Sequence, residues 1–286
     1  MNQLEDTGLD VSGFLRDLFP VCRSITGDGV RETLRRIGEE LPLAVHEIAS
    51  GTPVLDWTVP REWNIRDAYV KDASGHRVID FRASNLHVVN YSAPVQARMG
   101  LDELRPHLHT LPDHPDWIPY RTTYYQDTWG FCLRHRDYER LEDGEYEVVI
   151  DSTLEDGQLT WGELRLEGER EDEILLTTHV CHPSMANDNL SGIAVLTGLG
   201  RALARMDRRW SYRLLFLPGT IGSIAWLAQN RERVGRLRGA ITLAGVGDRG
   251  PASWKPTRGG DSMVDRAVKA ALADQDHRLL EYSPYG

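Results

Sequence analysis

The chain has 286 residues, 41% of them hydrophobic and 27% charged, which is enough to bury a core and is unlike a disordered or fibrous protein. Its 33 basic and 43 acidic residues give a net charge of −10, which argues against binding to nucleic acid or to an anionic membrane surface. The sequence shows no signal peptide, no apolar run of transmembrane length and only three widely spaced cysteines. We therefore expect a cytoplasmic protein without nucleic-acid or membrane partners.

The first part of the chain predicts helices, and the next part predicts strands. Residues 9–41 have the apolar spacing of two helices. From residue 45 to residue 165, short alternating runs are separated by turn residues, as in the segments 68–81 and 145–168. One short helix, at residues 101–108, interrupts these strands. This section of the chain is therefore predicted to be β-rich.

After Glu173 the pattern changes to alternating strands and helices. Strands are predicted at 174–180, 212–218 and 239–247, and helices at 189–206, 223–233 and 262–274. Continuous apolar strands between amphipathic helices indicate a mainly parallel or mixed sheet that is covered on both faces. We therefore predict a three-layer α/β domain formed by residues 1–45 and 165–286, with a smaller β-rich domain, residues 46–164, inserted into it.

Three potential metal ligands stand close together in the sequence. His179 ends the first of these strands, His182 lies in the polar loop that follows, and Asp188 precedes the next helix. Ligands gather at the carboxyl ends of strands in open α/β sheets, and two imidazoles with a carboxylate suit zinc. Asn189 and Ser191 are expected to hold the carboxylate by hydrogen bonds. The alternative is a histidine that makes structural hydrogen bonds and an acidic cluster that caps the helix.

Several sequence motifs resemble those of a known group of proteins. The stretch 177–192 resembles the zinc aminopeptidase clan of bacterial leucyl aminopeptidase, glutamate carboxypeptidase and transferrin receptor, in which a histidine at a strand end is followed by Asn-Asp-Asn-x-Ser-Gly or a close variant. The chain is more similar, nearly from end to end, to a bacterial group of aminopeptidase-like proteins with an inserted small domain. The motifs that carry this similarity are RSITG (23–27), DWTVP (56–60), EW (62–63), LHVVNYS (86–92), IPY (118–120), WGFC (129–132), CHPS (181–184) and PGTIGS (218–223).

The resemblance implies roles for the three potential ligands. His179 matches the ligand histidine of the clan, and Asp188 matches the aspartate that bridges two metal ions there. In the bacterial group the histidine of CHPS also faces the site, so His182 is an equal candidate to His179. The resemblance also implies a three-layer fold of the zinc-peptidase type.

Three departures from the clan's pattern favour one zinc ion over two. Cys181 occupies the place of an aspartate that orients a ligand. No acidic residue lies between Asp207 and Glu232, where the clan has a Glu-Glu pair that supplies a base and a ligand. Ala244 occupies the place of a later ligand aspartate, and Asp248 is the nearest acid. A site with one metal ion is therefore the simpler expectation.

We predict a zinc-dependent hydrolase of the aminopeptidase type that cleaves an N-terminal peptide bond or a related amide with a zinc-bound water. Arg121 and Tyr125 of the inserted domain are candidates for contacting the peptide or small amide substrate, although such an aromatic segment also suits the core of a small domain. The resemblance places the general base and the last ligand beyond residue 286. The chain is therefore expected to be incomplete at its C-terminus and inactive alone, and no catalytic residue is identified.

Two other functions remain open. One is a non-catalytic binding module that keeps the fold without the chemistry, because a fold does not determine a function. The other is an amidase or deacylase in a sugar or natural-product pathway. The sequence makes no prediction about the oligomeric state.

Overall fold

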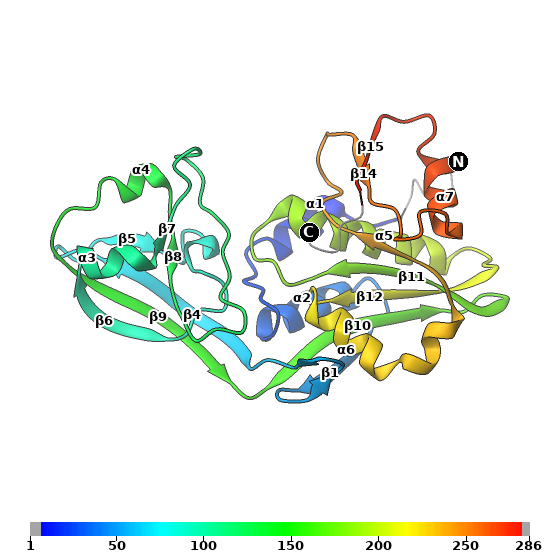
Figure 1. Ribbon diagram of the computed structural model, residues 1–286, viewed down its shortest axis with the longest axis horizontal. Helices are drawn as coiled ribbons and strands as arrows, with labels where there is room; N and C mark the ends of the chain where they lie inside the picture. The colour runs from blue at the N-terminus through cyan, green and yellow to red at the C-terminus, as the bar shows by residue number, and fades with distance from the viewer. Residues whose placement is uncertain (1–6, 282–286) are drawn as a thin grey trace.

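The computed structural model describes residues 7–281, which form two lobes that lie side by side (Figure 1). The larger lobe contains a five-stranded sheet in the order β1-β10-β12-β11-β13. Strand β11 is parallel to β12 and β13, whereas β10 is antiparallel to β1 and β12, so the sheet is mixed. These strands are β1 (Ala44–Ala49), β10 (Gln158–Leu166), β11 (Arg170–His179), β12 (Trp210–Leu217) and β13 (Leu237–Leu243).

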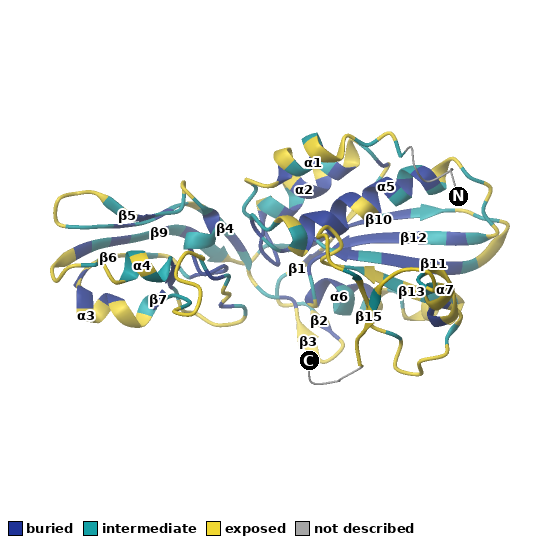
Figure 2. Ribbon diagram, turned by 90° about the horizontal axis from the view of Figure 1, so that it is seen from above, coloured by how far each residue is buried: buried dark blue, intermediate teal, exposed yellow. Residues whose placement is uncertain are grey.

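Helices cover both faces of this sheet. The helices on one face are α1 (Val11–Leu18), α2 (Asp28–Gly38) and α5 (Gly192–Ala204), and α6 (Ile221–Gln229) lies on the other. Because side chains alternate along a strand, Leu214 and Phe216 pack with the first group of helices, while Leu215 and Leu217 pack with α6. The layers are visible from above in Figure 2, where buried residues concentrate in the sheet and on the helix faces toward it. This arrangement confirms the predicted α/β architecture.

Short elements flank β13 in the larger lobe. The 3₁₀ helix η4 (Arg231–Arg236) precedes it, and β14 (Ala252–Trp254), α7 (Met263–Ala271) and β15 (His277–Leu279) follow it. Strands β14 and β15 pair in parallel. Ser262 and Asp265 cap the start of α7 reciprocally. Within residues 7–281, no helix is long and apolar enough to cross a membrane.

The smaller lobe has its own sheet and its own core. Its four strands lie in the order β5-β4-β9-β6 and are antiparallel. Ala68, Val70, Val148 and Phe131 are fully buried in this lobe's core. Its elements are β4 (Glu62–Lys71), β5 (Arg77–Asp80), η1 (Asn85–His87), β6 (Val95–Gly100), α3 (Leu101–Leu104), η2 (Arg105–His107), β7 (Leu108–His109), β8 (Phe131–Cys132), α4 (His135–Tyr138) and β9 (Glu145–Glu155). The short strands β2 (Pro53–Val54) and β3 (Trp57–Thr58) pair with each other and lie instead beside α6 of the larger lobe, where Val54 is buried.

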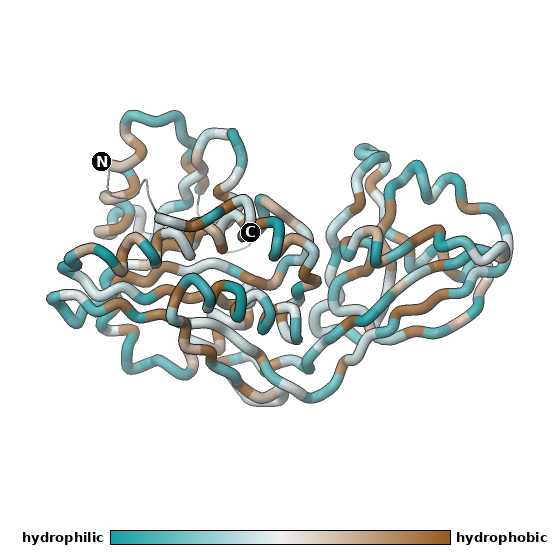
Figure 3. Tube along the Cα trace, turned by 180° about the vertical axis from the view of Figure 1, so that it is seen from behind, coloured by the Kyte–Doolittle hydropathy of each residue, from teal (hydrophilic) through white to brown (hydrophobic). Residues whose placement is uncertain are grey.

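The turn at residues 155–157 joins the two lobes. It separates β9 from β10 as predicted, but the two strands do not pair with each other, because β9 belongs to the small sheet and β10 to the large one. The predicted insertion, residues 46–164, contains the small lobe together with β2, β3 and parts of β1 and β10. The trace in Figure 3 shows hydrophobic segments along strands of both lobes.

A buried arginine ties three strands of the large sheet together. Arg213 on β12 is 2% exposed and donates two hydrogen bonds to Glu173 on β11, at 2.6 and 2.7 Å. It also donates to Glu163 on β10, whose other carboxylate oxygen accepts from Trp226 Nε1 of α6 at 3.0 Å. Each charge in this network has a partner of opposite sign, and this pairing compensates for the cost of burying the charges beside α6.

We expect the substitution Arg213→Met to lower the free energy of unfolding by about 3–5 kcal/mol, because it leaves Glu163 without a guanidinium partner and the buried Glu173 with Arg165 alone. Arg98→Met is the matched control, since the ion pair of Arg98 with Glu145 is exposed and contributes about 0–1 kcal/mol. Urea unfolding followed by circular dichroism measures both values. Equal losses in the two variants would contradict the role given to the buried network.

Candidate metal centre

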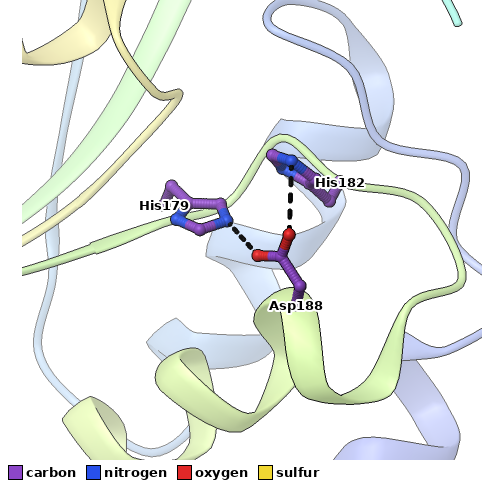
Figure 4. A group of neighbouring side chains, drawn as sticks. All are labelled: His179, His182 and Asp188. Carbon is purple, nitrogen blue, oxygen red and sulfur yellow. Dashed lines mark hydrogen bonds and ion pairs between the residues drawn. The ribbon is translucent and has the colours of Figure 1, made fainter. Parts of the chain in front are cut away.

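The end of β11 and the segment before α5 bring three ligand-type side chains together. His179 is the last residue of β11, His182 lies three residues later, and Asp188 lies in the π-helical segment η3 (Ala186–Ser191). Nε2 of His179 is 2.8 Å from Oδ1 of Asp188, and Nε2 of His182 is 3.8 Å from Oδ2 of the same residue (Figure 4). The carboxylate of Asp188 therefore faces both imidazoles.

Asn189 and Ser191 hold the loop rather than the carboxylate. The amide of Asn189 donates to Oγ1 of Thr178 at 2.8 Å and to the carbonyl of His179 at 3.0 Å. Its Oδ1 accepts from the backbone of Gly245 at 3.2 Å, and the hydroxyl of Ser191 accepts from the backbone of Val246 at 3.0 Å. The prediction that these two residues bind the Asp188 carboxylate was therefore wrong. They instead connect the loop to the segment that follows β13.

His182 is held at both its ring and its backbone. Its Nδ1 is 3.2 Å from Sγ of Cys181, which in turn donates to the carbonyl of Gly219 at 3.8 Å. Burial raises the pKa of Cys181 to about 12, so this side chain is a neutral thiol at neutral pH. With the thiol hydrogen on Gly219, the sulfur can accept from Nδ1–H, which leaves the lone pair of Nε2 toward Asp188. The buried guanidinium of Arg23 donates from Nε to the carbonyl of His182 at 2.8 Å.

The protonation states of the cluster suit a cation. Burial lowers the pKa of His182 to about 4, and the neighbouring His179 adds to the decrease. The hydrogen bond from His179 lowers the pKa of Asp188, although partial burial opposes this change. At neutral pH the cluster therefore offers a neutral His182 imidazole and an ionised carboxylate, which are the forms that bind metal ions.

The spacing of the donor atoms fits a zinc ion. Two ligands of a tetrahedral zinc site, each about 2.0–2.1 Å from the ion, are about 3.3 Å apart. The donor atoms of His179, His182 and Asp188 lie within 4.8 Å of one another, and the two separations that involve Asp188, 2.8 and 3.8 Å, bracket the expected value. Three protein ligands with one open position are typical of catalytic zinc sites. Over residues 7–281, this is the one group of three such side chains close enough to hold a metal.

The neighbouring loops bring no second carboxylate to the cluster. The segment 218–222, which follows β12, lies beside the site: a Cβ on Gly219 would be 3.4 Å from Cβ of His179. This segment contains no acidic residue. Asp248, the acid nearest to the end of β13, accepts a hydrogen bond from Asn187 at 2.9 Å and is not part of the group.

The inserted lobe reaches the cluster through a residue that was not predicted as a site residue. The ring of Tyr120 packs against His182, with 5.1 Å between the ring centroids. The predicted substrate residue Tyr125 is 48% exposed and packs edge-on against Trp57, and Arg121 is exposed. Their role in substrate binding stays a prediction. Both Tyr120 and Arg23 belong to motifs on which the resemblance rests, and this was the signal that could have identified them.

Comparison with known proteins supports the family resemblance. Residues 13–286 match the model of a family described as a domain of unknown function (DUF4910). A protein of Clostridium acetobutylicum, provisionally named a polysaccharide biosynthesis protein with an aminopeptidase-like domain, is 49% identical over 283 residues. These residues are 98% of this chain and 65% of that protein, so the chain spans about two thirds of the length of this curated relative.

Solved structures share the fold. A crystal structure of a provisionally named peptidase from Clostridium acetobutylicum has a TM-score of 0.96 at 49% identity, over 100% of this chain and 68% of that one. The zinc aminopeptidase BSAP from Bacillus subtilis has a TM-score of 0.64 at 12% identity, over 95% of this chain and 78% of that one. The predicted resemblance to zinc aminopeptidases is therefore confirmed for the fold.

We expect Gly192→Ala to destabilise the metal centre and the fold around it. A Cβ at this position would lie 2.5 Å from Asn189 Oδ1, 2.6 Å from Thr178 Oγ1 and 2.7 Å from the carbonyl of Leu243, so the start of α5 must move away from the strands. Overpacking of this kind costs about 1–3 kcal/mol. The measurement is the free energy of unfolding in urea.

The matched control is Gly198→Ala on the same helix. Its Cβ would first meet Thr7 at 3.3 Å, and alanine has a higher helix propensity than glycine, so we expect a neutral or slightly stabilising effect. A Gly192→Ala variant as stable as Gly198→Ala would show that the contact of α5 with the strands has room for a methyl group.

Proposed function

We propose that this chain, which belongs to the family described as a domain of unknown function (DUF4910), is part of a zinc-dependent hydrolase. It binds one zinc ion through His179, His182 and Asp188, and the ion promotes the hydrolysis of an N-terminal peptide bond or a related amide. The observation that carries this proposal is the convergence of two imidazoles and a carboxylate at the end of β11, in a fold shared with zinc aminopeptidases.

The number of ions follows from the charges available. One divalent ion needs the single carboxylate that the cluster contains, whereas a two-ion site is normally held by several carboxylates. Cys181 adds no negative charge, because burial raises the pKa of its thiol to about 12. This combination supports one zinc ion rather than two.

The residues around the cluster give the site its chemical properties. A bound zinc ion would polarise the scissile carbonyl and lower the pKa of a water molecule. Cys181 and Arg23 fix the orientation of His182, and the Tyr120 ring excludes water from one side of that imidazole. The hydrogen bonds of Asn189 to Thr178 and His179 keep the neighbouring Asp188 in place and do not involve the carboxylate oxygens of Asp188. The chain therefore contributes a rigid set of metal-ligand atoms, which need little rearrangement when the ion binds.

The substrate is proposed to be a peptide or a small amide. The Clostridium acetobutylicum relative carries a name that refers to polysaccharide biosynthesis, which supports amides of sugars as a second substrate class. Nucleic acid and membranes are not proposed as partners, because the net charge is −10. The three cysteines are all free thiols, which supports a cytoplasmic location.

A binding module without catalysis is the competing proposal. The observation that favours it is the segment 218–222, which lies beside His179 but supplies no carboxylate that could act as a general base. Such a module would bind zinc, or a small molecule at this site, and would release no product.

We expect the purified chain to bind one equivalent of zinc and the variant Asp188→Asn to lose most of this affinity. Asparagine keeps the size of the side chain and a hydrogen-bond acceptor, but it removes the negative charge that a divalent ion requires. Asp248→Asn is the matched control, because Asp248 binds Asn187 and lies outside the cluster. Isothermal titration calorimetry with metal-free protein measures both affinities. Stoichiometric zinc binding by Asp188→Asn would contradict the assignment of this ligand.

A substrate screen separates the catalytic proposals from the binding module. Because the chain spans 65% of its curated relative, the screen uses the zinc-loaded full-length protein. It is incubated with aminoacyl anilides and with N-acyl amino sugars, and product release is followed for the wild type and for Asp188→Asn. We expect turnover of one class, lost in the variant by at least about 100-fold, because the ion supplies several kcal/mol to the transition state. Zinc binding without turnover of either class would favour the binding module.

A further inference from the structure

The loop that carries Asp188 is attached to the segment after β13 by side chains at alternate positions. Asn187, Asn189 and Ser191 each accept a hydrogen bond from one of the three consecutive backbone N–H groups of the segment 245–247, at 2.8, 3.2 and 3.0 Å. Asp188 lies between these positions, and its carboxylate faces the two imidazoles instead (Figure 4). The neighbours of Asp188 thus make the contacts that fix the loop.

Asn187 is held at its side chain and at its backbone. Its Oδ1 accepts from the backbone N–H of Gly247 at 2.8 Å, and its Nδ2 donates to the carboxylate of Asp248 at 2.9 Å. Only one orientation of the amide satisfies both partners, because an N–H group cannot accept and an ionised carboxylate cannot donate. The carbonyl of Asn187 accepts from the hydroxyl of Ser191 at 2.6 Å. The position of residue 187 is therefore fixed by three hydrogen bonds.

The backbone at Asp188 depends on such support. Within η3 its φ and ψ are −110° and 89°, outside the helical region, so regular helical hydrogen bonding does not set the direction of its carboxylate. Asn189 holds the residue on one side through Thr178 and the carbonyl of His179. On the other side, the residue that precedes Asp188 is Asn187. A rotation of the backbone between these two anchors would turn the carboxylate away from the imidazoles.

Gly247 allows the close contact with η3. A Cβ at this position would be 2.6 Å from Cβ of Ser191 and 3.4 Å from Oδ1 of Asn187. A methyl group therefore has no room unless the segment moves away from η3, and such a movement would separate the N–H of Gly247 from Asn187. The absence of a side chain at Gly247 is thus part of the same contact.

We propose that Asn187 is a positioning residue for the candidate metal ligand Asp188. By tying the backbone before Asp188 to the segment 245–248, it holds the carboxylate in the direction of His179 and His182. This inference rests on the proposed function, because it concerns the same zinc site. It predicts that the affinity for zinc depends on a side chain that is not itself a ligand.

The test measures zinc binding by the metal-free protein, in competition with a chelator of known affinity. We expect Asn187→Ala to bind zinc about tenfold more weakly than the wild type, at the lower end of the range for residues that support metal ligands. Asn64→Ala is the matched control, because Asn64 also accepts from a backbone N–H, that of Asp28, and donates to a carboxylate, that of Glu62. We expect this control to keep the zinc affinity of the wild type.

The visible absorption of bound Co²⁺ separates a positioning role from a general loss of stability. Co²⁺ binds to imidazole and carboxylate ligands as zinc does, and its spectrum reports the number and geometry of those ligands. We expect Asn187→Ala to change this spectrum, because the carboxylate of Asp188 no longer meets the ion in the same direction. Asn64→Ala should leave the spectrum as it is in the wild type.

A second variant breaks the same contact from the other side. We expect Gly247→Ala to weaken zinc binding to a similar extent as Asn187→Ala, and the double variant to show no further loss, since both changes remove one contact. Losses that add up in the double variant would show that the two residues act independently, and this would overturn the inference. Asp248→Asn keeps an oxygen that can accept from Asn187, so we expect it to bind zinc as the wild type does.

The outcomes separate the failure of this inference from the failure of the proposed function. Wild-type zinc affinity or an unchanged Co²⁺ spectrum in Asn187→Ala overturns the positioning role, and so does an equal loss of affinity in Asn64→Ala. A wild type that binds no zinc overturns the proposed function, and this inference falls with it.

Discussion

The amide side chain of Asn189 provides the constraint on which the candidate metal centre depends. It links Thr178 and the carbonyl of His179, at the end of β11, to the backbone of Gly245 beyond β13. Asn189 is 2% exposed, so losing any of these bonds would leave a buried polar group without a partner. Asp188 immediately precedes this anchor. Its carboxylate is therefore placed opposite His179 by its neighbour and remains available to a cation.

The small lobe takes part in the same structure. Trp63 and Tyr91 of that lobe belong to one hydrophobic core with Trp226 of α6, so the lobes share buried apolar surface. Asn90 binds the backbone of Arg23, and Arg23 binds the backbone of His182. The path from the small lobe to the proposed ligand thus consists of two hydrogen bonds. This explains physically why motifs that are far apart in the sequence, around residues 23, 90 and 182, occur together in one chain.

The sequence predicted those features that depend on local spacing. The apolar runs at 174–180 and 212–218 predicted strands, because a strand that is covered on both faces is apolar throughout. The three candidate ligands were found because His179, His182 and Asp188 lie within ten residues of one another. The roles of Asn189 and Ser191 were misjudged, since their partners lie more than 50 residues away, after β13. The turn at 155–157 resembles that of a hairpin, and only the pairing of β10 with β12 shows otherwise. Tyr120 approaches His182 from another lobe, and no local pattern encodes that contact.

The charges next to the cluster bear on the proposal of a single zinc ion. Arg23 is 1% exposed and binds the carbonyls of Leu18 and His182, and within residues 7–281 no carboxylate pairs with it. Its positive charge therefore acts on the site with little screening, since burial excludes the water that would weaken it. Asp188 can balance the charge of one divalent ion in part, but a second ion would repel both the first and Arg23. The carboxylates that overcome this repulsion in two-metal sites have no counterpart in the segment 218–222, which supports the single-ion proposal on electrostatic grounds.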